Sequence, residues 1–329
     1  MQAITISKFG GPEVLVAADF PKPEPKPGEV RVRLACAGVN YIDVYMRNGS
    51  YARSDTYKTP LPMVPGMEGA GTVDALGDGV TGLAVGERVA YCISRGSYAE
   101  YAVVPAWRLV RVPEAMPLPI ACALMLQGST AHYLTHSAYP LAAGNVCLIH
   151  AGAGGVGQLM IQLAKARGAV VIATVGSEAK AAIARERGAD HVVLYRDIDF
   201  RDEVLRLTAG RGVDVAYDSV GRDTVHRSIR SLRRRGLCVM FGASSGQVDA
   251  IAPLELAEAG SVFFTRPHLA DYMQDADEIQ RRAADLFAAW QGNRLDVAID
   301  RTLPLREAAV AHALIEDRAT RGKLLLAIE

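Results

Sequence analysis

The residues with the clearest chemical meaning lie at 150–157, where the chain reads HAGAGGVG. Gly152, Gly154 and Gly157 have the spacing G-x-G-x-x-G, between an apolar run, NVCLIHA, and a helix-like run, QLMIQLAKARG. In that setting the first glycine allows a tight turn, the second lets the backbone approach a diphosphate, and the third lets the helix pack closely on the strand. A diphosphate would then meet the positive end of the helix that starts near Val156. The motif predicts dinucleotide binding, and a glycine-rich turn without a ligand is the simpler alternative.

The choice of dinucleotide depends on the end of the next apolar run, VIATVGSEAK (171–180). Proteins that bind NAD place a carboxylate there, about 20 residues after the glycines, to accept the ribose hydroxyls. Gly176 and Ser177 occupy that position, and Lys180 follows, either as a partner for a 2′-phosphate or as an ordinary surface lysine. Glu178 is nearby, but at the start of a helix it is interpreted as a solvated charge that the helix dipole favours. The pattern favours NADPH over NADH.

The elements around this loop alternate between strand and helix from about residue 123 to 263. The expected strands are NVCLIHA (145–151), VVIATV (170–175), HVVLY (191–195), VDVAYDSV (213–220), LCVMFGA (237–243) and SVFFT (261–265). Between them lie amphipathic runs that each end on glycine, which tolerates the left-handed helix C-terminus: QLMIQLAKARG, EAKAAIARERG, FRDEVLRLTAG and HRSIRSLRRRG. Apolar strands separated by helices predict a parallel sheet covered on both faces, so the fold class is α/β with a doubly wound Rossmann sheet.

The flanking regions have a different pattern. The first 120 residues or so are rich in Pro, Gly and short Val-rich runs such as EVRVRLACAGVN (29–40) and GERVAYCI (86–93), which predict a mostly β domain. After the central region we expect a helix at 275–291, a short strand at 296–299, a helix at 305–317 and a last strand at 323–329. These elements could return to the first domain, because the central unit is already complete.

Composition argues against several classes of protein. With 36 basic and 36 acidic residues the formal net charge is zero, so no chain-wide attraction to nucleic acid or anionic membranes is expected. The start, MQAITISKFGG, lacks the order of a secretory signal, and the apolar stretch MPLPIACALML (116–126) is too short to span a membrane. The five cysteines are scattered without a C-x-x-C pair, which argues against a disulfide framework or a structural zinc knot and favours a cytoplasmic location.

Eight short segments together carry a family resemblance. They are AGVNYIDVYMRNGSY (37–51), PLPMVPGMEGAGTV (60–73), LQGSTAHYL (126–134), HAGAGGVG (150–157), YDSVGRDT (217–224), FGASSG (241–246), TRPHL (265–269) and EDRAT (316–320). On these segments the chain resembles the zinc-independent, zeta-crystallin-like quinone oxidoreductases of the medium-chain dehydrogenase/reductase superfamily over nearly its whole length. The resemblance implies a β-rich GroES-like catalytic domain (1–122), an inserted Rossmann domain that binds NADPH (123–263), and a C-terminal segment (264–329) that returns to the catalytic domain. It also implies a cofactor in the cleft between the domains.

Two positions bear on the use of zinc. Zinc-dependent relatives carry Cys and His as ligands where this chain has Asn40 and Met67, and neither Asn nor Met is a usual zinc ligand. The lobe of four cysteines that holds their structural zinc is also missing. His132 and His136 lie four residues apart, but HYLTH lacks the glutamate of H-E-x-x-H, which favours a core or surface position for both. No metal site is expected, and alcohol oxidation through a zinc alkoxide is disfavoured.

The reaction implied by the resemblance is hydride transfer from C4 of the nicotinamide of NADPH to a quinone, which needs little Lewis-acid help. The resemblance implies that Asn40 lies near the nicotinamide and that Asp43, Tyr45 and Tyr51 line the substrate cleft as catalytic candidates. A tyrosine hydroxyl could hydrogen-bond the developing oxyanion or deliver a proton, although water could protonate an exposed quinol. Alternatively, the tyrosines only pack and Asp43 only orients its loop.

The resemblance also implies a set of cofactor contacts, to which Asn40 belongs. Gln127 and Thr130 are expected near the nicotinamide ribose and carboxamide. The diphosphate is expected against the loop residues Gly152, Ala153, Gly154, Gly155, Val156 and Gly157. The side of the adenosine 2′-phosphate is expected to involve Gly176, Ser177, Lys180, Tyr195 and Arg318. Strand ends or the cleft rim are expected to hold Ser219, Phe241, Gly242, Ser244, Phe264 and Arg266, some of them structural, with Phe264 equally a candidate for the core.

The basic run RSIRSLRRRG (227–236) is interpreted as a solvated helix that ends in arginines rather than as a nucleic-acid surface, because the run is short and the chain is neutral. The sequence thus predicts an NADPH-dependent quinone oxidoreductase for small quinones or enones, without a membrane partner. From the family likeness alone it is expected to form a homodimer. Two alternatives stay open: an enoyl or alkenal/one reductase, and an NADPH-binding structural or RNA-binding protein with little catalysis.

Overall fold

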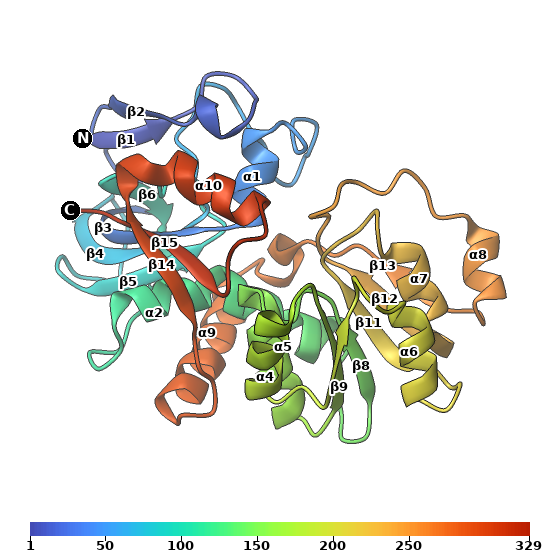
Figure 1. Cartoon of the computed structure of the whole chain (residues 1–329). Helices are drawn as coiled ribbons and strands as arrows, with labels where there is room; N and C mark the ends of the chain where they lie inside the picture. The colour runs from blue at the N-terminus through green and yellow to red at the C-terminus, as the bar shows by residue number, and fades with distance from the viewer. The chain divides into compact units, whose positions relative to one another are not determined.

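The structure, a computed structural model, describes residues 1–329 and divides into two compact units (Figure 1). Unit 1 consists of Met1–Ser129, Met273–Gln291 and Val297–Glu329, and unit 2 consists of Thr130–Tyr272 and Gly292–Asp296. The C-terminal part of the chain therefore contributes mainly to the same unit as the N-terminal part. No helix combines the length and the apolar character that crossing a membrane requires.

Unit 1 is built on β-sheets. A small antiparallel sheet pairs β1 (Gln2–Thr5) with β2 (Val16–Asp19). A seven-stranded sheet has the order β14-β15-β3-β4-β5-β7, with β6 also paired to β3. Its strands are β3 (Glu29–Val39), β4 (Glu68–Leu76), β5 (Arg88–Cys92), β6 (Tyr101–Pro105), β7 (Val110–Arg111), β14 (Ile299–Pro304) and β15 (Lys323–Ala327). The antiparallel pairing of β15 with β3 joins the end of the chain to residues near its beginning.

The helices of unit 1 are short except for one. They are α1 (Tyr41–Arg47), α2 (Leu118–Ala123), α9 (Ala276–Gln291) and α10 (Ala308–Glu316), with a π-helical turn at Leu124–Gly128 and 3-10 turns at Pro12–Val14, Ala106–Arg108 and Leu305–Glu307. The helix expected at 275–291 is confirmed as α9. The prediction of a strand at 296–299 is wrong, because the strand in this region is β14 (Ile299–Pro304), which pairs in parallel with β15. Its half-exposed residues, IDRTLP, give no alternating apolar signal.

Unit 2 contains a six-stranded parallel sheet with the order β10-β9-β8-β11-β12-β13. Its strands are β8 (Val146–Ile149), β9 (Val170–Val175), β10 (His191–Leu194), β11 (Val213–Asp218), β12 (Leu232–Met240) and β13 (Phe263–Thr265). Its helices are α3 (Ser129–Tyr133), α4 (Gly155–Ala166), α5 (Glu178–Glu186), α6 (Phe200–Leu207), α7 (Val225–Arg230) and α8 (Pro253–Glu258), and Leu134–Ala138 forms a π-helical turn. The doubly wound α/β fold is confirmed, and the strand order reverses between β8 and β11, the point where such sheets bind ligands.

The core of unit 2 explains why these segments become strands. Continuous Val, Ile and Leu residues on the strands are buried, among them Leu148 on β8 and Ile172 on β9. They pack against apolar residues of α6 and α7, including Val204 and Ile229, both of which are fully buried. A strand that is buried on both faces cannot alternate apolar and polar residues, and the sequence shows the continuous runs that this burial requires.

The basic run at 227–236 differs from the expected helix. Helix α7 ends at Arg230, and Arg233, Arg234 and Arg235 belong to β12. The extended conformation lets Arg233 Nε donate to Asp214 Oδ1 at 2.5 Å across the parallel β11–β12 pair. Arg235, with φ of 57°, takes the left-handed conformation that had been expected of the following glycine. The arginines therefore do not share one helical face.

Candidate functional site

The glycine loop joins β8 to α4, as the motif predicts. The left-handed residue of its turn is Ala151, with φ of 53°, so the role expected of the first glycine belongs to the residue before it. Gly152 is needed for packing instead, because an added Cβ would lie 2.9 Å from the Cβ of Ala173 on β9. At Gly157 an added Cβ would overlap the carbonyl oxygen of Ala151, so the third glycine lets α4 approach the strand as predicted.

The loop has the features that a diphosphate needs. Gly154 is the N-cap of α4 in an extended conformation, and its amide donates to Ala151 O at 2.9 Å. Ala153 is fixed because Gln158 Nε2 donates to its carbonyl oxygen at 2.9 Å. The first amides of a helix, here those of Gly155 and Val156, have no partner within it and lie at its positive end. The residues present therefore fit a bound diphosphate.

The end of β9 presents the predicted phosphate residues. Ser177 is the exposed N-cap of α5, and its side chain makes no capping hydrogen bond. Glu178 forms a 2.5 Å ion pair with Arg185 and its side chain is 65% exposed, which confirms it as a solvated charge. Lys180 lies in the first turn of α5. The Tyr195 hydroxyl lies 2.8 Å from the place that a Cβ on Gly176 would take, so Tyr195 and the predicted phosphate residues are brought together.

The ends of β11 and β12 bring four further candidates together. The amides of Phe241 and Gly242 donate to Asp218 O at 2.8 and 3.4 Å, and Ser244 N donates to Ser219 O at 3.2 Å. An added Cβ on Gly242 would lie 2.7 Å from Ser219 O, so only glycine allows this approach. The two loops thus lie side by side at the carboxyl edge of the sheet.

The other unit 2 candidates are more scattered. Thr130 is buried in α3. Phe264 packs against the apolar core, as its alternative interpretation expects, and Arg266 donates through Nη1 to Pro267 O at 3.1 Å. The rings of His132 and His136 stack with centroids 4.1 Å apart. This ring stacking agrees with the interpretation of the two histidines as packing residues rather than as metal ligands.

In unit 1, Asn40 lies in a buried cluster of polar side chains. Its Nδ2 donates to Glu68 Oε2 at 2.9 Å, and its Oδ1 accepts from Lys323 Nζ at 2.7 Å. Lys323 also forms an ion pair with Glu68, and Leu126 N donates to Glu68 Oε1 at 2.5 Å. The side chains of Glu68 and Lys323 are no more than 1% exposed, so each charge depends on these partners. The amide group of Asn40 is therefore held in one orientation.

Asp43 joins Asn40 to a second chain of hydrogen bonds. Asp43 Oδ2 accepts from Asn40 N at 2.9 Å and from the Tyr98 hydroxyl at 3.4 Å. His312 lies between Tyr98, 3.0 Å from its Nε2, and Arg47, 3.1 Å from its Nδ1. Because a guanidinium can only donate, Nδ1 accepts and Nε2 carries the proton. The donors therefore run in one direction, from Arg47 through His312 and Tyr98 to Asp43.

Burial sets the protonation of this chain. Desolvation raises the pKa of Asp43 to about 7, partly opposed by the hydrogen bond from Asn40 N and by the charge of Lys323. Desolvation, together with the charge of Arg47, lowers the pKa of His312 to about 3, so this histidine is neutral. Asp43 Oδ1 is buried without a hydrogen-bond partner. Asp43 is thus a carboxyl group that titrates near neutral pH beside Asn40.

The tyrosine candidates form a row of rings. Tyr45 and Tyr51 have ring centroids 5.3 Å apart, and Tyr51 stacks on Tyr57 at 5.3 Å. Tyr41 lies at the other end, 5.8 Å from Tyr45, and its hydroxyl donates to Ile315 O at 2.9 Å. Tyr45 and Tyr51 are half-buried. They are therefore partly packing groups, and partly open to a ligand.

Two remaining candidates lie elsewhere in unit 1. Gln127 is buried in the π-helical turn, directly after the residue whose amide donates to Glu68. Arg318 follows α10 with φ of 56° and is exposed. Burial raises the pKa of Tyr41, and the charge of Arg318 opposes that rise, which places Arg318 near the tyrosine row.

Several residues of these networks were missed by the sequence analysis. In unit 1 they are Glu68, Lys323, Tyr98, His312 and Arg47. The signal that could have found two of them is a charge at the first position of a buried apolar strand, as in EGAGTV and KLLLA, because a charged residue is rarely buried unless it is paired. No group of three His, Cys, Asp or Glu side chains is placed to hold a metal ion.

The chain resembles known proteins over nearly its whole length. The family model for alcohol dehydrogenase GroES-like domains matches residues 26–114, and that for zinc-binding dehydrogenases matches residues 155–289. A 2-haloacrylate reductase of Burkholderia is 41% identical, over 99% of this chain and 98% of that protein. A probable quinone oxidoreductase of Schizosaccharomyces pombe is 42% identical, over 98% of this chain and 96% of that protein. The solved structure of Escherichia coli quinone oxidoreductase complexed with NADPH superposes with a TM-score of 0.96 at 38% identity, covering 99% of this chain and 100% of the other.

The buried ion pair of unit 1 gives a stability prediction. We expect Lys323→Met to lower the free energy of unfolding by about 3–5 kcal/mol, because Glu68 is left charged and unpaired. The double variant Glu68→Gln/Lys323→Met should regain part of that loss, since no buried charge remains uncompensated. Denaturant unfolding of the three proteins at pH 7 measures both changes. Equal stability of the Lys323→Met variant and the unmodified chain would contradict the account.

The buried carboxyl of Asp43 gives a pH prediction. Its pKa of about 7 lies above the unfolded value of 3.8, so between these two values the folded chain holds the proton that the unfolded chain has lost. This group therefore makes the free energy of unfolding fall as pH rises from about 4 to about 7. Asp43→Asn removes that dependence. The free energy of unfolding of the Asp43→Asn variant minus that of the unmodified chain should therefore increase from pH 5 to pH 8 in denaturant titrations. A difference that does not change with pH would contradict the raised pKa.

Proposed function

This chain belongs to the quinone oxidoreductase family of the medium-chain dehydrogenase/reductase superfamily, and on that basis we propose that it reduces quinones with NADPH. The observation that carries the proposal is the similarity over the full length to quinone oxidoreductases, one of which has been solved with NADPH bound. The glycine loop of unit 2 supports it independently, because its geometry fits a dinucleotide diphosphate. NADPH, when bound, supplies a hydride from C4 of its nicotinamide.

In the proposed enzyme, unit 2 residues bind and orient the cofactor. The amides at the start of α4, from Gly155 and Val156, hold the diphosphate. The exposed hydroxyl of Ser177, the N-cap of α5, and the ammonium group of Lys180, in the first turn of α5, would bind the 2′-phosphate. No carboxylate stands at the end of β9 to accept the ribose hydroxyls, and the nearest one, Glu178, is paired with Arg185, which favours NADPH over NADH.

Residues of unit 1 would serve the acceptor. Glu68 and Lys323 hold the Asn40 amide in one orientation, which would suit the contact with the nicotinamide that the family resemblance implies for this residue. The half-buried Tyr45 and Tyr51 can donate a hydroxyl proton to the oxygen on which negative charge develops. Asp43 orients the start of α1 through Asn40 N, in agreement with the orienting interpretation of this residue.

A second candidate function is reduction of a C=C bond conjugated with a carbonyl or carboxylate group. The 41% identity with a 2-haloacrylate reductase favours it, since that substrate carries such a bond. Both acceptors take a hydride at an electron-poor carbon and leave negative charge on an oxygen, so the same polar groups would serve either reaction. The acceptor therefore has to be decided by assay.

The assembly and the location belong to the same proposal. Strand β13 is an outer strand of the unit 2 sheet and carries Phe263, which is 62% exposed. An open strand edge with an exposed aromatic residue suits pairing with a second copy, which supports the homodimer. All five cysteines are free and buried, which agrees with a reducing, cytoplasmic location.

The proposed activity is tested by the loss of NADPH absorbance in the presence of 1,4-benzoquinone or 9,10-phenanthrenequinone. We expect turnover with NADPH that clearly exceeds turnover with NADH at the same concentration. Turnover of 2-haloacrylates or enones with inactivity toward quinones would favour the second candidate. Tight NADPH binding without turnover of any of these acceptors would contradict both candidates and leave a binding protein.

The phosphate pocket gives a separate prediction. We expect Lys180→Ala to raise the KM for NADPH by about tenfold, since a charge-assisted contact to phosphate is lost, while the KM for NADH stays the same. Arg185→Ala, on the same helix but paired with Glu178, is the matched control and should change neither constant. An equal rise of both KM values in Lys180→Ala would show that this lysine does not contact the 2′-phosphate.

A further inference from the structure

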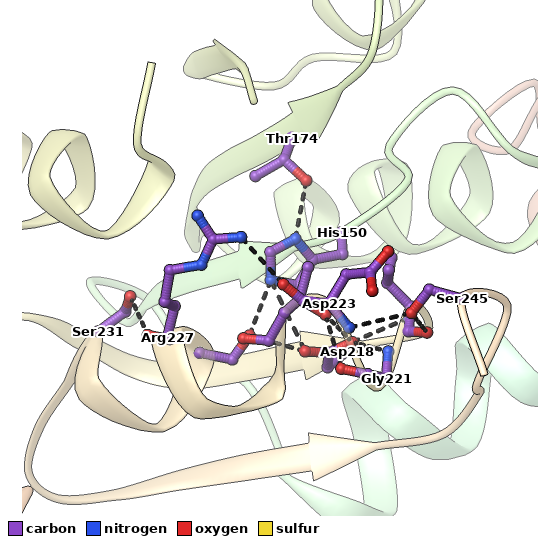
Figure 2. A network of polar contacts seen from close by, with 11 residues as sticks. His150, Thr174, Asp218, Gly221, Asp223, Arg227, Ser231 and Ser245 are labelled. Carbon is purple, nitrogen blue, oxygen red and sulfur yellow. Dashed lines mark hydrogen bonds and ion pairs between the residues drawn. The ribbon is translucent and has the colours of Figure 1, made fainter. Parts of the chain in front are cut away.

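A buried histidine lies where three strands of unit 2 end. His150 follows β8 directly, Thr174 is near the end of β9, and Asp218 is the last residue of β11. Figure 2 shows His150 between Thr174 and Asp218, with a contact toward each side. All three side chains are no more than 2% exposed. The proposed mechanism assigns no role to any of them.

The histidine ring is fixed through both of its nitrogens. Its Nδ1 lies 2.8 Å from Thr174 Oγ1, and its Nε2 lies 2.9 Å from Ser228 Oγ. Ser228 Oγ donates in turn to Asp218 Oδ2 at 2.7 Å. The ring of Phe200 meets the imidazole edge-on, with centroids 4.7 Å apart. The imidazole therefore has one position and two polar partners.

The acceptors determine where the histidine proton lies. Asp218 Oδ1 accepts from Val220 N, Gly221 N and Thr224 Oγ1 at 2.8, 2.9 and 2.8 Å. The single hydrogen of Ser228 Oγ is directed to Asp218 Oδ2, with Thr224 O as a second acceptor at 3.1 Å, so Ser228 Oγ must accept from His150 Nε2. The other nitrogen, Nδ1, then accepts from Thr174. Burial lowers the pKa of His150, which agrees with a neutral ring.

This arrangement is not that of a nucleophilic triad. In such a triad the histidine lies between the serine and the carboxylate and takes the serine proton. Here Ser228 lies between His150 and Asp218, and its hydroxyl donates a hydrogen bond to the carboxylate. The network is also closed to water, because Ser228 is fully buried. Its role is therefore to hold other parts of the chain in place.

Three members of the network each precede a loop predicted to contact the cofactor, and the fourth, Ser228, lies on α7. His150 leads into the glycine loop, Thr174 into Gly176 and Ser177, and Asp218 into Ser219. Backbone bonds run in parallel with the side chains: Gly152 N donates to Thr174 O, and His150 N donates to Tyr217 O, both at 3.1 Å. The loop after β12, which contains Ser245, is bonded to the loop after β11. Ser245 Oγ accepts from Asp223 N at 3.0 Å and donates to Val220 O at 2.7 Å (Figure 2).

We propose that His150, held by Thr174, Ser228 and Asp218, is a positioning residue that sets the relative placement of the cofactor-binding loops. The inference rests on the proposed binding of NADPH by these loops. A neutral imidazole suits this role because it accepts on one side and donates on the other, and so joins a threonine to a serine without placing a charge beside the diphosphate. Loss of one of these bonds should weaken cofactor binding more than it slows turnover at saturating NADPH.

The test compares two substitutions of Thr174. Thr174→Val keeps the shape but removes the hydroxyl that donates to His150, whereas Thr174→Ser keeps the hydroxyl. We expect Thr174→Val to raise the Kd for NADPH, measured by fluorescence titration, at least fivefold, with kcat at saturating NADPH changed less than twofold. Thr174→Ser should bind within twofold of the unmodified chain.

A control separates this role from general stability. Val213 is fully buried at the opposite end of β11, so Val213→Ala should lower the Tm without changing the Kd. Ser228→Ala is the second variant, and it should raise the Kd as Thr174→Val does. Equal NADPH affinity of Thr174→Val, Thr174→Ser and the unmodified chain would overturn the inference while leaving the proposed function standing. Failure of the unmodified chain to bind NADPH would overturn both.

Discussion

Each of the two units is organised around a carboxylate that is withdrawn from water and must find its hydrogen-bond donors within the protein. In unit 1 this is Glu68, which accepts from an ammonium, a side-chain amide and a backbone amide. In unit 2 it is Asp218, whose donors are two hydroxyls and two backbone amides. Because a buried acceptor without donors is costly, each carboxylate fixes the segments that supply them. Three of the predicted functional residues, Asn40, Gln127 and Ser219, lie on or directly beside those segments.

The fold explains why the carboxylates can do this. Strands β8, β9 and β11 are parallel and neighbouring, so their carboxyl ends meet at one edge, and polar residues that follow the apolar runs come within hydrogen-bond reach. In unit 1 the antiparallel pairing of β15 with β3 brings Lys323 to Asn40. The strands position the loops that follow them, and the hydrogen-bond networks of Glu68 and Asp218 fix the conformation of the segments that donate to them.

The sequence predicts the strands and helices of unit 2 well because their signals are local. Continuous apolar strands, amphipathic helices and a glycine motif can all be recognised within 20 residues or so. The buried networks depend on contacts between distant residues, since Lys323 lies 283 residues from Asn40 and His150 lies 78 residues from Ser228. The residues near Asn40 or His150 in the sequence give no indication of these distant partners. The basic run at 227–236 was misinterpreted for the same reason: Arg233 is extended because it pairs with Asp214, on the neighbouring strand.

The central claim is that a dinucleotide diphosphate binds at the start of α4, on a loop whose shape the glycines allow. A crystal structure of the chain grown with NADPH tests this most directly. The account predicts electron density for the diphosphate against the backbone of Gly154, Gly155 and Val156, with the adenosine phosphate near Ser177. Density for the cofactor at another place, with this loop empty, would contradict the account.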